Sequence, residues 1–469
     1  MIDSIKNSQP VDERVRIPRE LAQFLRQETY SLLIKGHTGT GKTTLALSIL
    51  KELNANKNCL YISTRISPDQ LFQYHPWIEN FFGKSKESEA TENSEGKPSH
   101  HIFVDGRLDE PGSLFERITN ELMDVKAPII VIDTWDAIGF LMDKEALMNN
   151  AKVLQTWRER AGAKLIFVIE TSEDNTFDFL VDGIVELRQK HYNERRMREI
   201  FLSKLHGVRI NKPSYIFSVN NSIFHSYEHY NPSEFSDAVY FLPKNVNKEF
   251  SRNDHFSTGY REFDKVLGGG FPLGGAISIE LNPHVNAKIA LGFLNKIIVQ
   301  FIASQNSVII HPFEKTSLEM LTRYQKSLGS QKNRINTIST TVQTKKSTKF
   351  VTEKQIRQKI LGIKKENQKN LLLTIFGPEM VNLISKNEPN TNELDLLSFI
   401  KSNSDLTVFI SRRPSDNGHT PVSEICDVRL SIHDIDGTMC LQSDTPWSEI
   451  YAIVVQPEKD DRIKLEPIV

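Results

Sequence analysis

Short apolar runs alternate with longer amphipathic stretches through the first half of the chain. The apolar runs predict buried strands at residues 31–35, 59–63, 101–105, 129–133 and 165–170. Between them, apolar positions three and four residues apart predict helices at residues 45–53, 68–82, 112–122 and 144–161. This alternation favours an α/β fold, in which a mostly parallel sheet is flanked by helices.

Shorter alternating runs follow, and they predict antiparallel strands that close one edge of the sheet. These runs cover residues 182–189, 199–204, 215–219 and 223–225. Residues 83–100 are polar and rich in Ser, Glu and Lys, so we expect a loop there.

The pattern breaks at residues 232–253 and then starts again. Strands are predicted at residues 276–281, 307–311, 371–376, 406–411 and 428–433, with a helix at 288–302 after the first of them. The order of elements repeats that of the first half, although an unrelated second α/β domain would give a similar pattern. We expect two tandem domains, residues 1–231 and 254–469, joined by a linker at residues 232–253.

The loop after the first predicted strand carries candidate chemistry. Residues 36–44 fit the phosphate-binding pattern G-x-x-x-x-G-K-[ST], with an apolar strand before them and a helix after them. Glycines let successive backbone N–H groups turn toward phosphate oxygens, and the helix N-terminus adds its positive end. In this context a chance glycine-rich turn is the weaker alternative. The expected nucleotide-binding residues are Gly36, His37, Thr38, Gly39, Thr40, Gly41, Lys42, Thr43 and Thr44.

Two of these residues and one aspartate have more specific expected roles. Lys42 would reach the β- and γ-phosphates, and the Thr43 hydroxyl would ligate Mg²⁺. Asp133 ends the apolar run 129–133, where an aspartate hydrogen-bonds the Mg²⁺ waters and the threonine hydroxyl in phosphate-loop enzymes. An ordinary strand-end carboxylate is the alternative for Asp133.

Composition and charge narrow the class of protein. The 469 residues are 39% hydrophobic and 25% charged, as in ordinary globular proteins, and a net charge of −1 gives no overall polyanion-binding signature. The three cysteines show no C-x-x-C spacing, which fits a reducing compartment. No signal-peptide pattern or membrane-length apolar run is present. We therefore expect a soluble, cytoplasmic protein that does not contact membranes.

The second half lacks the residues of a phosphate loop. An ungapped alignment of residues 45–47 with 289–291 matches Gly36, Gly39, Gly41, Lys42 and Thr43 with Glu280, Pro283, Val285, Asn286 and Ala287. A proline and a β-branched valine at such positions argue against a hidden phosphate site. The second domain is expected to be degenerate.

These residues together resemble the RecA-like ATPases of the KaiC/GvpD group. The likeness rests first on the phosphate loop and on residues 129–134, which are similar to a Walker B strand. It rests also on residues 257–272, which resemble the T-G-x-x-x-x-D-x-x-L-G-G-G segment at the start of KaiC-type domains. Residues 179–188 and 202–207 resemble the edge strands that end such a domain. Within the group the chain resembles the gas-vesicle regulator GvpD, which also combines one amino-terminal phosphate loop with basic clusters. The resemblance implies tandem RecA-like P-loop NTPase domains, the second degenerate, and binding of ATP and Mg²⁺.

The resemblance also implies a glutamate pair after the second strand, but this chain has Thr64 and Arg65 there. Thr64 can orient a water molecule and cannot take its proton at neutral pH. Arg65 could stabilise phosphoryl charge or pair with a neighbouring acid. Glu170 could act as a sensor near the phosphates or form a salt bridge. We expect an ATPase of slow turnover, if it hydrolyses ATP at all.

In proteins of the KaiC/GvpD group, a lysine and an arginine on an edge strand reach into the nucleotide site of the neighbouring subunit. Lys204 matches that lysine, His206 replaces the arginine, and Arg209 could substitute for it. A catalytic Lys204 acting in trans implies a homo-oligomer. An exposed lysine that protects a sheet edge is the alternative.

Two basic segments complete the candidate features. One comprises Arg188, Lys190, Arg195, Arg196 and Arg198. It could bind an acidic partner or nucleic-acid phosphate, but a solvated hairpin tip is the favoured interpretation. The other, residues 325–370, has twelve Lys and Arg against Glu353 and Glu366, with almost no aromatic residues to stack on bases.

The sequence favours a nucleotide-dependent regulatory switch that works through a homo-oligomer or a protein partner. A nucleic-acid-dependent ATPase of the recombinase type is the alternative, although the near-neutral charge and the aromatic-poor basic stretch count against it. A kinase is a third option without an acceptor-binding signature.

Overall fold

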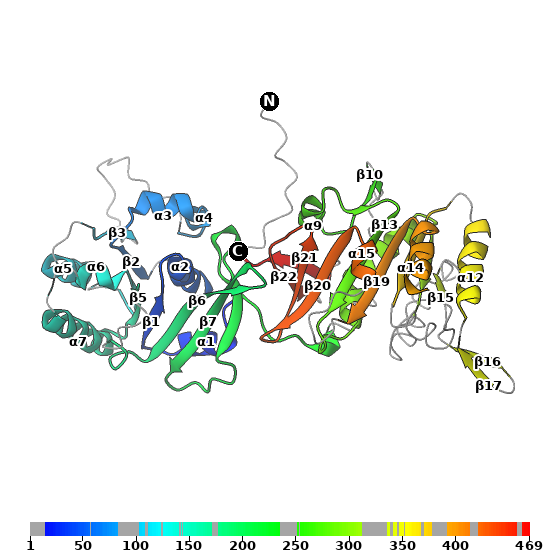
Figure 1. The fold of residues 1–469 in the computed structure, drawn as a ribbon. Helices are drawn as coiled ribbons and strands as arrows, with labels where there is room; N and C mark the ends of the chain where they lie inside the picture. Colours follow the sequence, from blue (N-terminus) through cyan, green and yellow to red (C-terminus); the bar gives the residue numbers. More distant parts are fainter. Residues whose placement is uncertain are drawn as a thin grey trace, which may run out of the picture. The chain divides into compact units, whose positions relative to one another are not determined.

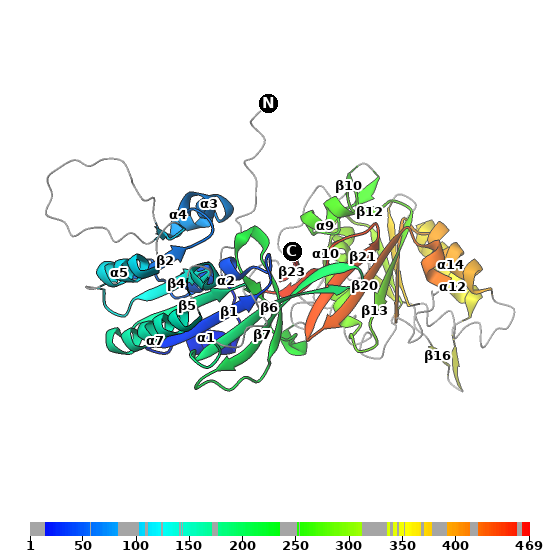
Figure 2. The same cartoon turned by 60° about the vertical axis from the view of Figure 1, so that its left-hand side comes forward.

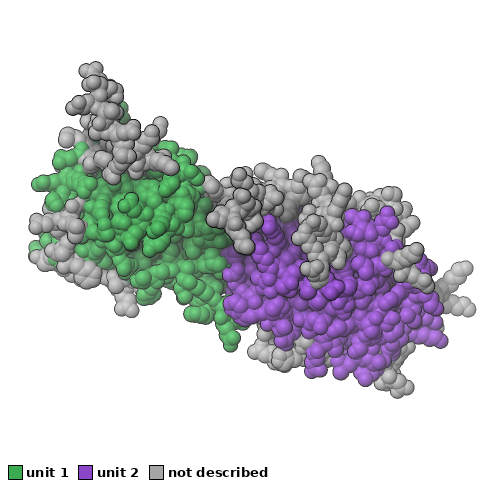
Figure 3. Space-filling view, turned by 90° about the horizontal axis from the view of Figure 1, so that it is seen from above, with its two compact units in different colours: residues 1–228, 468–469 green, residues 229–467 purple. Residues whose placement is uncertain are grey.

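The computed structural model describes residues 15–56, 58–82, 103–107, 111–122, 125–139, 142, 144–170, 177–234, 251–252, 254–311, 335–337, 341–344, 347–350, 352–366, 370–377, 392–412, 421–456 and 462–469. The chain divides into two compact units, residues 1–228 with 468–469 and residues 229–467 (Figure 3). The expected loop at 83–100 lies outside the described residues, as do most of the expected linker 232–253 and much of the basic stretch 325–370.

A nine-stranded sheet forms the centre of the first unit, in the order β3-β2-β4-β5-β1-β6-β7-β8-β9 (Figure 1). The parallel strands are β1 (Tyr30–Gly36), β2 (Cys59–Ser63), β3 (Phe103–Asp105), β4 (Ile129–Asp133), β5 (Lys164–Ile169) and β6 (Gly183–Tyr192). The antiparallel strands β7 (Arg195–Leu205), β8 (Ser214–Ser218) and β9 (His225–Ser226) continue the sheet beyond β6. The predicted α/β class, with antiparallel strands at one edge, is confirmed. The run 182–189, predicted among the antiparallel strands, instead forms β6, which pairs parallel with β1 and antiparallel with β7.

Helices cover both faces of this sheet because successive residues of a strand point to opposite faces (Figure 2). In β1, Leu32 and Ile34 pack in one buried cluster, whereas Leu33 packs in the other. The first cluster includes residues of α1 (Arg19–Leu25), α2 (Lys42–Glu52), α3 (Pro68–Tyr74) and α4 (Trp77–Phe82). The second includes residues of α5 (Pro111–Leu122), α6 (Trp135–Gly139) and α7 (Lys144–Ala161).

The prediction of one helix over residues 68–82 is wrong. The structure has two helices there, and α3 ends at Tyr74 just before His75 and Pro76. A proline restricts the residue before it to extended conformations and removes a backbone donor, so the helix stops. The amphipathic pattern continued across the break because both helices bury apolar side chains on the same face of the sheet.

The second unit repeats the strand order of the first, as β15-β14-β18-β19-β13-β20-β21-β22-β23. Its parallel strands are β13 (Gly275–Leu281), β14 (Ser307–Ile310), β15 (Ile335–Thr337), β18 (Leu372–Phe376), β19 (Leu406–Arg412) and β20 (Val428–Ile435). Antiparallel β21 (Thr438–Thr445), β22 (Tyr451–Val455) and β23 (Ile463–Pro467) complete it. Two small sheets accompany it, β10 (Ser251–Arg252) with β11 (His255–Phe256) and β12 (Phe271–Pro272), and β16 (Thr341–Thr344) with β17 (Ser347–Phe350). The two tandem α/β folds are therefore confirmed.

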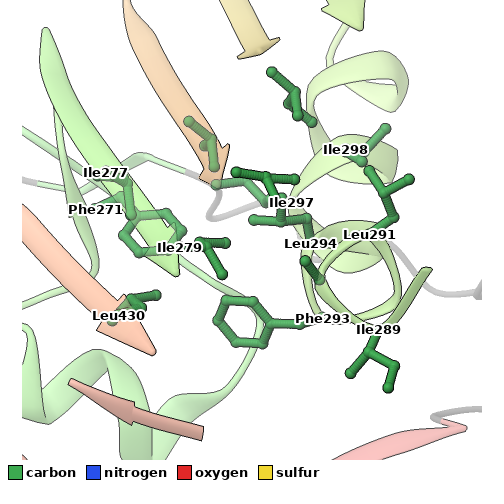
Figure 4. Close-up of a cluster of buried hydrophobic side chains, with 14 of the residues drawn as sticks. Phe271, Ile277, Ile279, Ile289, Leu291, Phe293, Leu294, Ile297, Ile298 and Leu430 are labelled. Carbon is green, nitrogen blue, oxygen red and sulfur yellow. The ribbon is translucent and has the colours of Figure 1, made fainter. Parts of the chain in front are cut away.

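Helices also cover both faces of the second sheet. One side has α9 (Arg261–Val266) and α10 (Lys288–Ala303), and the other has α12 (Glu353–Glu366), α14 (Glu393–Ser402) and α15 (Pro421–Ile425). Figure 4 shows Phe293, Leu294 and Ile297 of α10 facing Ile277 and Ile279 of β13. In both units the described helices are too short or too polar to cross a membrane.

Candidate functional site

Residues 36–44 join the carboxyl end of β1 to the first turn of α2. Gly41 precedes α2 with a φ of +105°, a conformation that favours glycine. At Gly36, an added Cβ would lie 2.6 Å from the Leu187 carbonyl oxygen of β6 and 2.8 Å from Thr40 Oγ1. Glycine at these two places therefore gives the tight curl that a phosphate cradle requires, and the residues present fit a bound phosphate.

The Lys42 ammonium lies over the curl of this loop. Its Nζ donates hydrogen bonds to the carbonyl oxygens of Gly36 (2.8 Å) and His37 (2.9 Å), and it lies 4.0 Å from Glu170 Oε1. Burial lowers the pKa of Lys42, and the nearby Glu170 carboxylate opposes that shift. A buried cation held at the loop by neutral carbonyl groups is well placed to pair with phosphate oxygens.

Thr43 and Asp133 meet beside this lysine. The Thr43 hydroxyl donates to Asp133 Oδ2 at 2.8 Å, and the Tyr61 hydroxyl donates to the same oxygen. Asp133 is buried, and burial raises the pKa of its carboxyl, against these hydrogen bonds and the charge of Lys42. The structure brings together the two residues expected at Mg²⁺, and a hydroxyl with a carboxylate is an oxygen donor set that suits this ion. Their metal role stays a prediction.

Thr64 connects the ends of β2 and β4. Its buried hydroxyl accepts a hydrogen bond from the Thr134 N–H (2.7 Å) and donates to the Thr134 carbonyl (2.8 Å). A hydroxyl has one proton to donate, and here the backbone receives it. In this arrangement Thr64 braces the two strand ends, and its expected role of orienting a water molecule stays untested.

Glu170 lies where β5 ends, close to the phosphate loop. It forms an ion pair with Arg65 and accepts a hydrogen bond from the Thr38 hydroxyl at 3.3 Å. Of the alternatives for Arg65, pairing with a neighbouring acid is the one present in the structure. Both interpretations of Glu170 remain compatible with its position, because it forms a salt bridge and also lies near Lys42.

Asp136 is a further carboxylate that the sequence interpretation missed. It lies on α6 and accepts a hydrogen bond from the backbone N–H of Glu170. Burial raises the pKa of its carboxyl. The only sign of Asp136 in the sequence was an acidic residue three positions after Asp133. Tyr61 was missed as well, because the sequence shows it only as a tyrosine in an apolar strand.

Lys204 does not join this group of residues. It lies on β7 opposite Ile184, which is itself paired with Leu33 in the middle of β1. Its Nζ donates to the carbonyl oxygens of Asp178 (3.2 Å) and Val181 (2.7 Å). This place is compatible with a role in a neighbouring subunit or with a simple edge-strand lysine, so the trans role stays a prediction.

The basic cluster on β6 and β7 divides into two groups. Arg188 pairs with Glu186, and Lys190 pairs with Glu199. Arg196 and Arg198 instead donate to the Gly39 carbonyl oxygen, at 3.2 and 2.8 Å, and Arg198 is only 6% exposed. The fifth member, Arg195, is 5% exposed and donates to the Asn193 carbonyl oxygen at 2.9 Å. The favoured interpretation of a solvated hairpin tip is wrong for Arg195 and Arg198. The sequence did not show that β6 pairs with β1. This pairing places the β6–β7 hairpin beside the phosphate loop.

The corresponding place in the second unit is filled by side chains. Strand pairing puts Leu281, rather than Glu280, at the register position of Gly36, so the ungapped alignment was one residue out. Val285 and Ala287 are buried in the core of this unit. Arg412 takes the register position of Glu170 and donates to the carbonyl oxygens of Pro283 (2.8 Å) and Val285 (3.1 Å). An apolar and arginine-capped turn therefore replaces the glycine curl.

Comparisons with known proteins agree with this geometry. The model of the family "GvpD gas vesicle protein, P-loop domain" matches residues 21–203. Protein GvpD2 of Halobacterium salinarum is 26% identical over 319 residues, which are 65% of this chain and 63% of that protein. Protein GvpD1 of the same organism is 26% identical over 309 residues, 64% of this chain and 56% of that protein.

A second group of relatives matches over a shorter stretch. The circadian clock oscillator protein KaiC of Thermosynechococcus vestitus is 24% identical over 255 residues, 51% of this chain and 45% of that protein. The chain thus spans less than two thirds of the length of each of these curated relatives. Residues 21–203 match the GvpD P-loop domain, and the chain is similar to KaiC/GvpD-like P-loop proteins, which agrees with the RecA-like fold of its first unit.

Proposed function

We propose that the first unit binds ATP with Mg²⁺ and acts as a nucleotide-dependent regulatory switch of slow turnover. The observation that carries this proposal is the convergence of Lys42 with the hydrogen-bonded pair Thr43 and Asp133 at the glycine loop. These side chains and the loop N–H groups form the donor set that a nucleoside triphosphate and its metal require.

Each of these groups has a specific task in the proposal. Backbone N–H groups of the loop and the start of α2 bind phosphate oxygens, and Lys42 exchanges its carbonyl partners for the β- and γ-phosphates. The Thr43 hydroxyl ligates Mg²⁺, and Asp133 orients that hydroxyl and the metal waters. Bound Mg²⁺ would neutralise part of the phosphate charge.

Slow turnover follows from how the candidate catalytic groups are engaged. Hydrolysis needs a group that orients or deprotonates the attacking water. The Thr64 hydroxyl is bonded to the backbone of Thr134, and the Glu170 carboxylate is paired with Arg65. Thr64 cannot act as a base, and Glu170 can do so only after its ion pair with Arg65 breaks, so ATP is held longer than in a fast motor enzyme.

The regulatory part of the proposal rests on the contrast between the two units. With Val285 and Arg412 in place of a glycine loop, the second unit is suited to a scaffold or partner-binding role. ATP would then control assembly of a homo-oligomer or contact with a protein partner, to the extent that it binds one state more tightly. Lys204 would contribute to a neighbouring subunit's site in such an oligomer.

The test compares the wild-type protein with Lys42→Ala. ATP binding and turnover are measured with and without single- and double-stranded DNA, and mass is measured by light scattering with and without Mg·ATP. The proposal expects tight binding, slow DNA-independent turnover and an ATP-dependent change in assembly. Turnover strongly stimulated by DNA would instead support the recombinase-type alternative. A Lys204→Ala variant that assembles and turns over ATP like wild type would remove the trans role.

A further inference from the structure

The hairpin formed by β6 and β7 extends past the end of β1 and runs beside the phosphate loop. β6 is paired with β1 up to Leu187 opposite Gly36, and it then continues to Tyr192 before the chain turns into β7. The turn residues Asn193 and Glu194 both have positive φ, as a type I′ hairpin turn requires. The first residues of β7 are therefore brought alongside the loop that follows β1.

Arg196 and Arg198 lie on the same side of β7 because residues two apart in a strand share a face. Both guanidinium groups donate to one carbonyl oxygen, that of Gly39, at 3.2 and 2.8 Å. Arg198 Nη1 also lies 4.0 Å from the position that a Cβ on Gly41 would occupy. The two arginines thus reach the loop at two of its glycines.

These two arginines differ in their partners from Arg188 and Lys190 of the same hairpin. Arg188 and Lys190 are paired with Glu186 and Glu199. Across the described ranges, neither Arg196 nor Arg198 contacts a carboxylate side chain. Apart from the Gly39 carbonyl, Arg198 donates through Nε to the backbone oxygen of Val469, the last residue of the sequence, at 2.7 Å.

The electrostatics of this arrangement favour an anion. Burial and the adjacent Arg196 lower the pKa of Arg198 to about 10. Two like charges that share one neutral acceptor, one of them buried, are unfavourable unless a negative group lies close to them. A guanidinium group forms its strongest hydrogen bonds with planar or tetrahedral oxyanions such as phosphate.

We propose that Arg196 and Arg198 are phosphate-binding residues of the nucleotide site, supplied by the same chain. Their ligand is the polyphosphate of a nucleoside triphosphate. Its oxygens accept hydrogen bonds from the two guanidinium groups, either in place of the Gly39 carbonyl oxygen or together with it. The inference rests on the proposed function and extends that site from the loop to the neighbouring hairpin.

The test uses Arg196→Gln and Arg198→Gln, with Arg160→Gln as a control. Arg160 is exposed on α7 and the control removes the same charge at a distance from the loop. Calorimetry measures Mg·ATP affinity, and inorganic tripolyphosphate is used as a competitor that has no base or sugar. Losing one charge-assisted hydrogen bond weakens affinity by roughly 10-fold or more. We expect this loss for ATP and tripolyphosphate in both test variants and no loss in the control.

Salt dependence separates phosphate binding from a mere brace on the loop. Removing a charge that pairs with phosphate lowers the dependence of affinity on ionic strength, whereas removing a structural brace does not. Because Arg198 is buried, Arg198→Lys serves as a second variant in case Arg198→Gln unfolds, and it is expected to retain the salt dependence. Thermal unfolding of each variant checks the fold.

The outcomes separate this inference from the function on which it rests. If Lys42→Ala abolishes ATP binding but folded Arg196→Gln and Arg198→Gln bind ATP and tripolyphosphate like wild type, the arginine assignment is overturned alone. Unchanged salt dependence in both folded variants would also overturn it, in favour of a brace. If wild type binds no ATP, both proposals fail together.

Discussion

Thr43 donates a hydrogen bond to Asp133 across 2.8 Å, and this bond ties the first turn of α2 to the end of β4. Two residues far apart in the sequence are thereby held as one oxygen donor set beside Lys42. The Tyr61 hydroxyl fixes the same carboxylate from β2. The loop and the strand end are therefore arranged before any ligand binds, which reduces the cost of ordering them on binding.

Asp133→Asn tests the expected metal role. Removing the negative charge while retaining the shape is expected to abolish most of the gain in ATP affinity that Mg²⁺ provides, because the amide is a poor partner for metal waters. Calorimetry with Mg²⁺ and with EDTA measures that gain. Asp105→Asn is the control, since Asp105 is partly exposed and paired with Arg107. A full Mg²⁺ effect in Asp133→Asn would contradict the assignment.

The pH dependence of Mg·ATP binding follows from two shifted groups. The pKa of Asp133 is raised by burial, so its carboxyl takes up a proton at a higher pH than an ordinary aspartate. The pKa of Lys42 is lowered by burial, so its charge is lost at a lower pH than that of an ordinary lysine. Binding needs the carboxylate and the ammonium, and affinity is expected to fall on both sides of neutral pH. Titrations of wild type against Asp133→Asn check the acidic limb, which should be weaker in the variant because only protonation of the phosphates of ATP remains.

Glu170→Gln tests whether this carboxylate takes part in hydrolysis. General-base assistance contributes about 10²-fold or more to a rate, so turnover is expected to fall by at least ~10-fold even from a slow value. ATP affinity should change little, because Lys42 keeps its loop contacts. Single-turnover phosphate release gives the rate. Equal rates in variant and wild type would leave Glu170 with only its salt bridge to Arg65.

Gly36→Ala tests the close approach of the loop to β6. The added Cβ would meet the backbone oxygen of Leu187 at 2.6 Å, so the loop must move and nucleotide binding is expected to be lost. Gly162→Ala is a matched control, because Gly162 has a φ of +68° and an added Cβ there would meet nothing within 4 Å. The control should cost only about 1 kcal/mol of unfolding free energy, from its positive φ. Denaturant unfolding gives the stability of the two variants, and calorimetry gives their ATP affinity. Retained ATP binding in Gly36→Ala would contradict the tight curl of the loop.

The core of the fold was accessible from the sequence because its signals are local. The apolar runs 59–63 and 129–133 coincide with β2 and β4, since Asn58 and Thr64 bound the first run and Pro128 and Thr134 bound the second. The phosphate loop was also accessible, because its glycines, lysine and threonine are consecutive. The two-residue strands β10, β11 and β12 were not predicted, because very short strands show no periodicity. Helix α12 was missed although its buried residues Ile356, Ile360 and Ile363 have helical spacing.

The parts of the site that the sequence did not reveal depend on tertiary neighbours. Arg196 and Arg198 were recognised as basic residues, but their contact with Gly39 depends on β6 lying next to β1. Asp136 reaches Glu170 only because α6 follows β4 and packs against β5. No local pattern encodes such pairings, since strand order in a parallel sheet is set by long-range crossovers.

The central claim is that one working nucleotide site exists in a two-unit chain, and calorimetric stoichiometry tests it most directly. Titration of the full chain with Mg·ATP is expected to give one ATP bound per chain, and Lys42→Ala is expected to abolish that binding while the protein stays folded. Two ATP molecules bound per chain, or one bound with unchanged affinity in folded Lys42→Ala, would contradict the account.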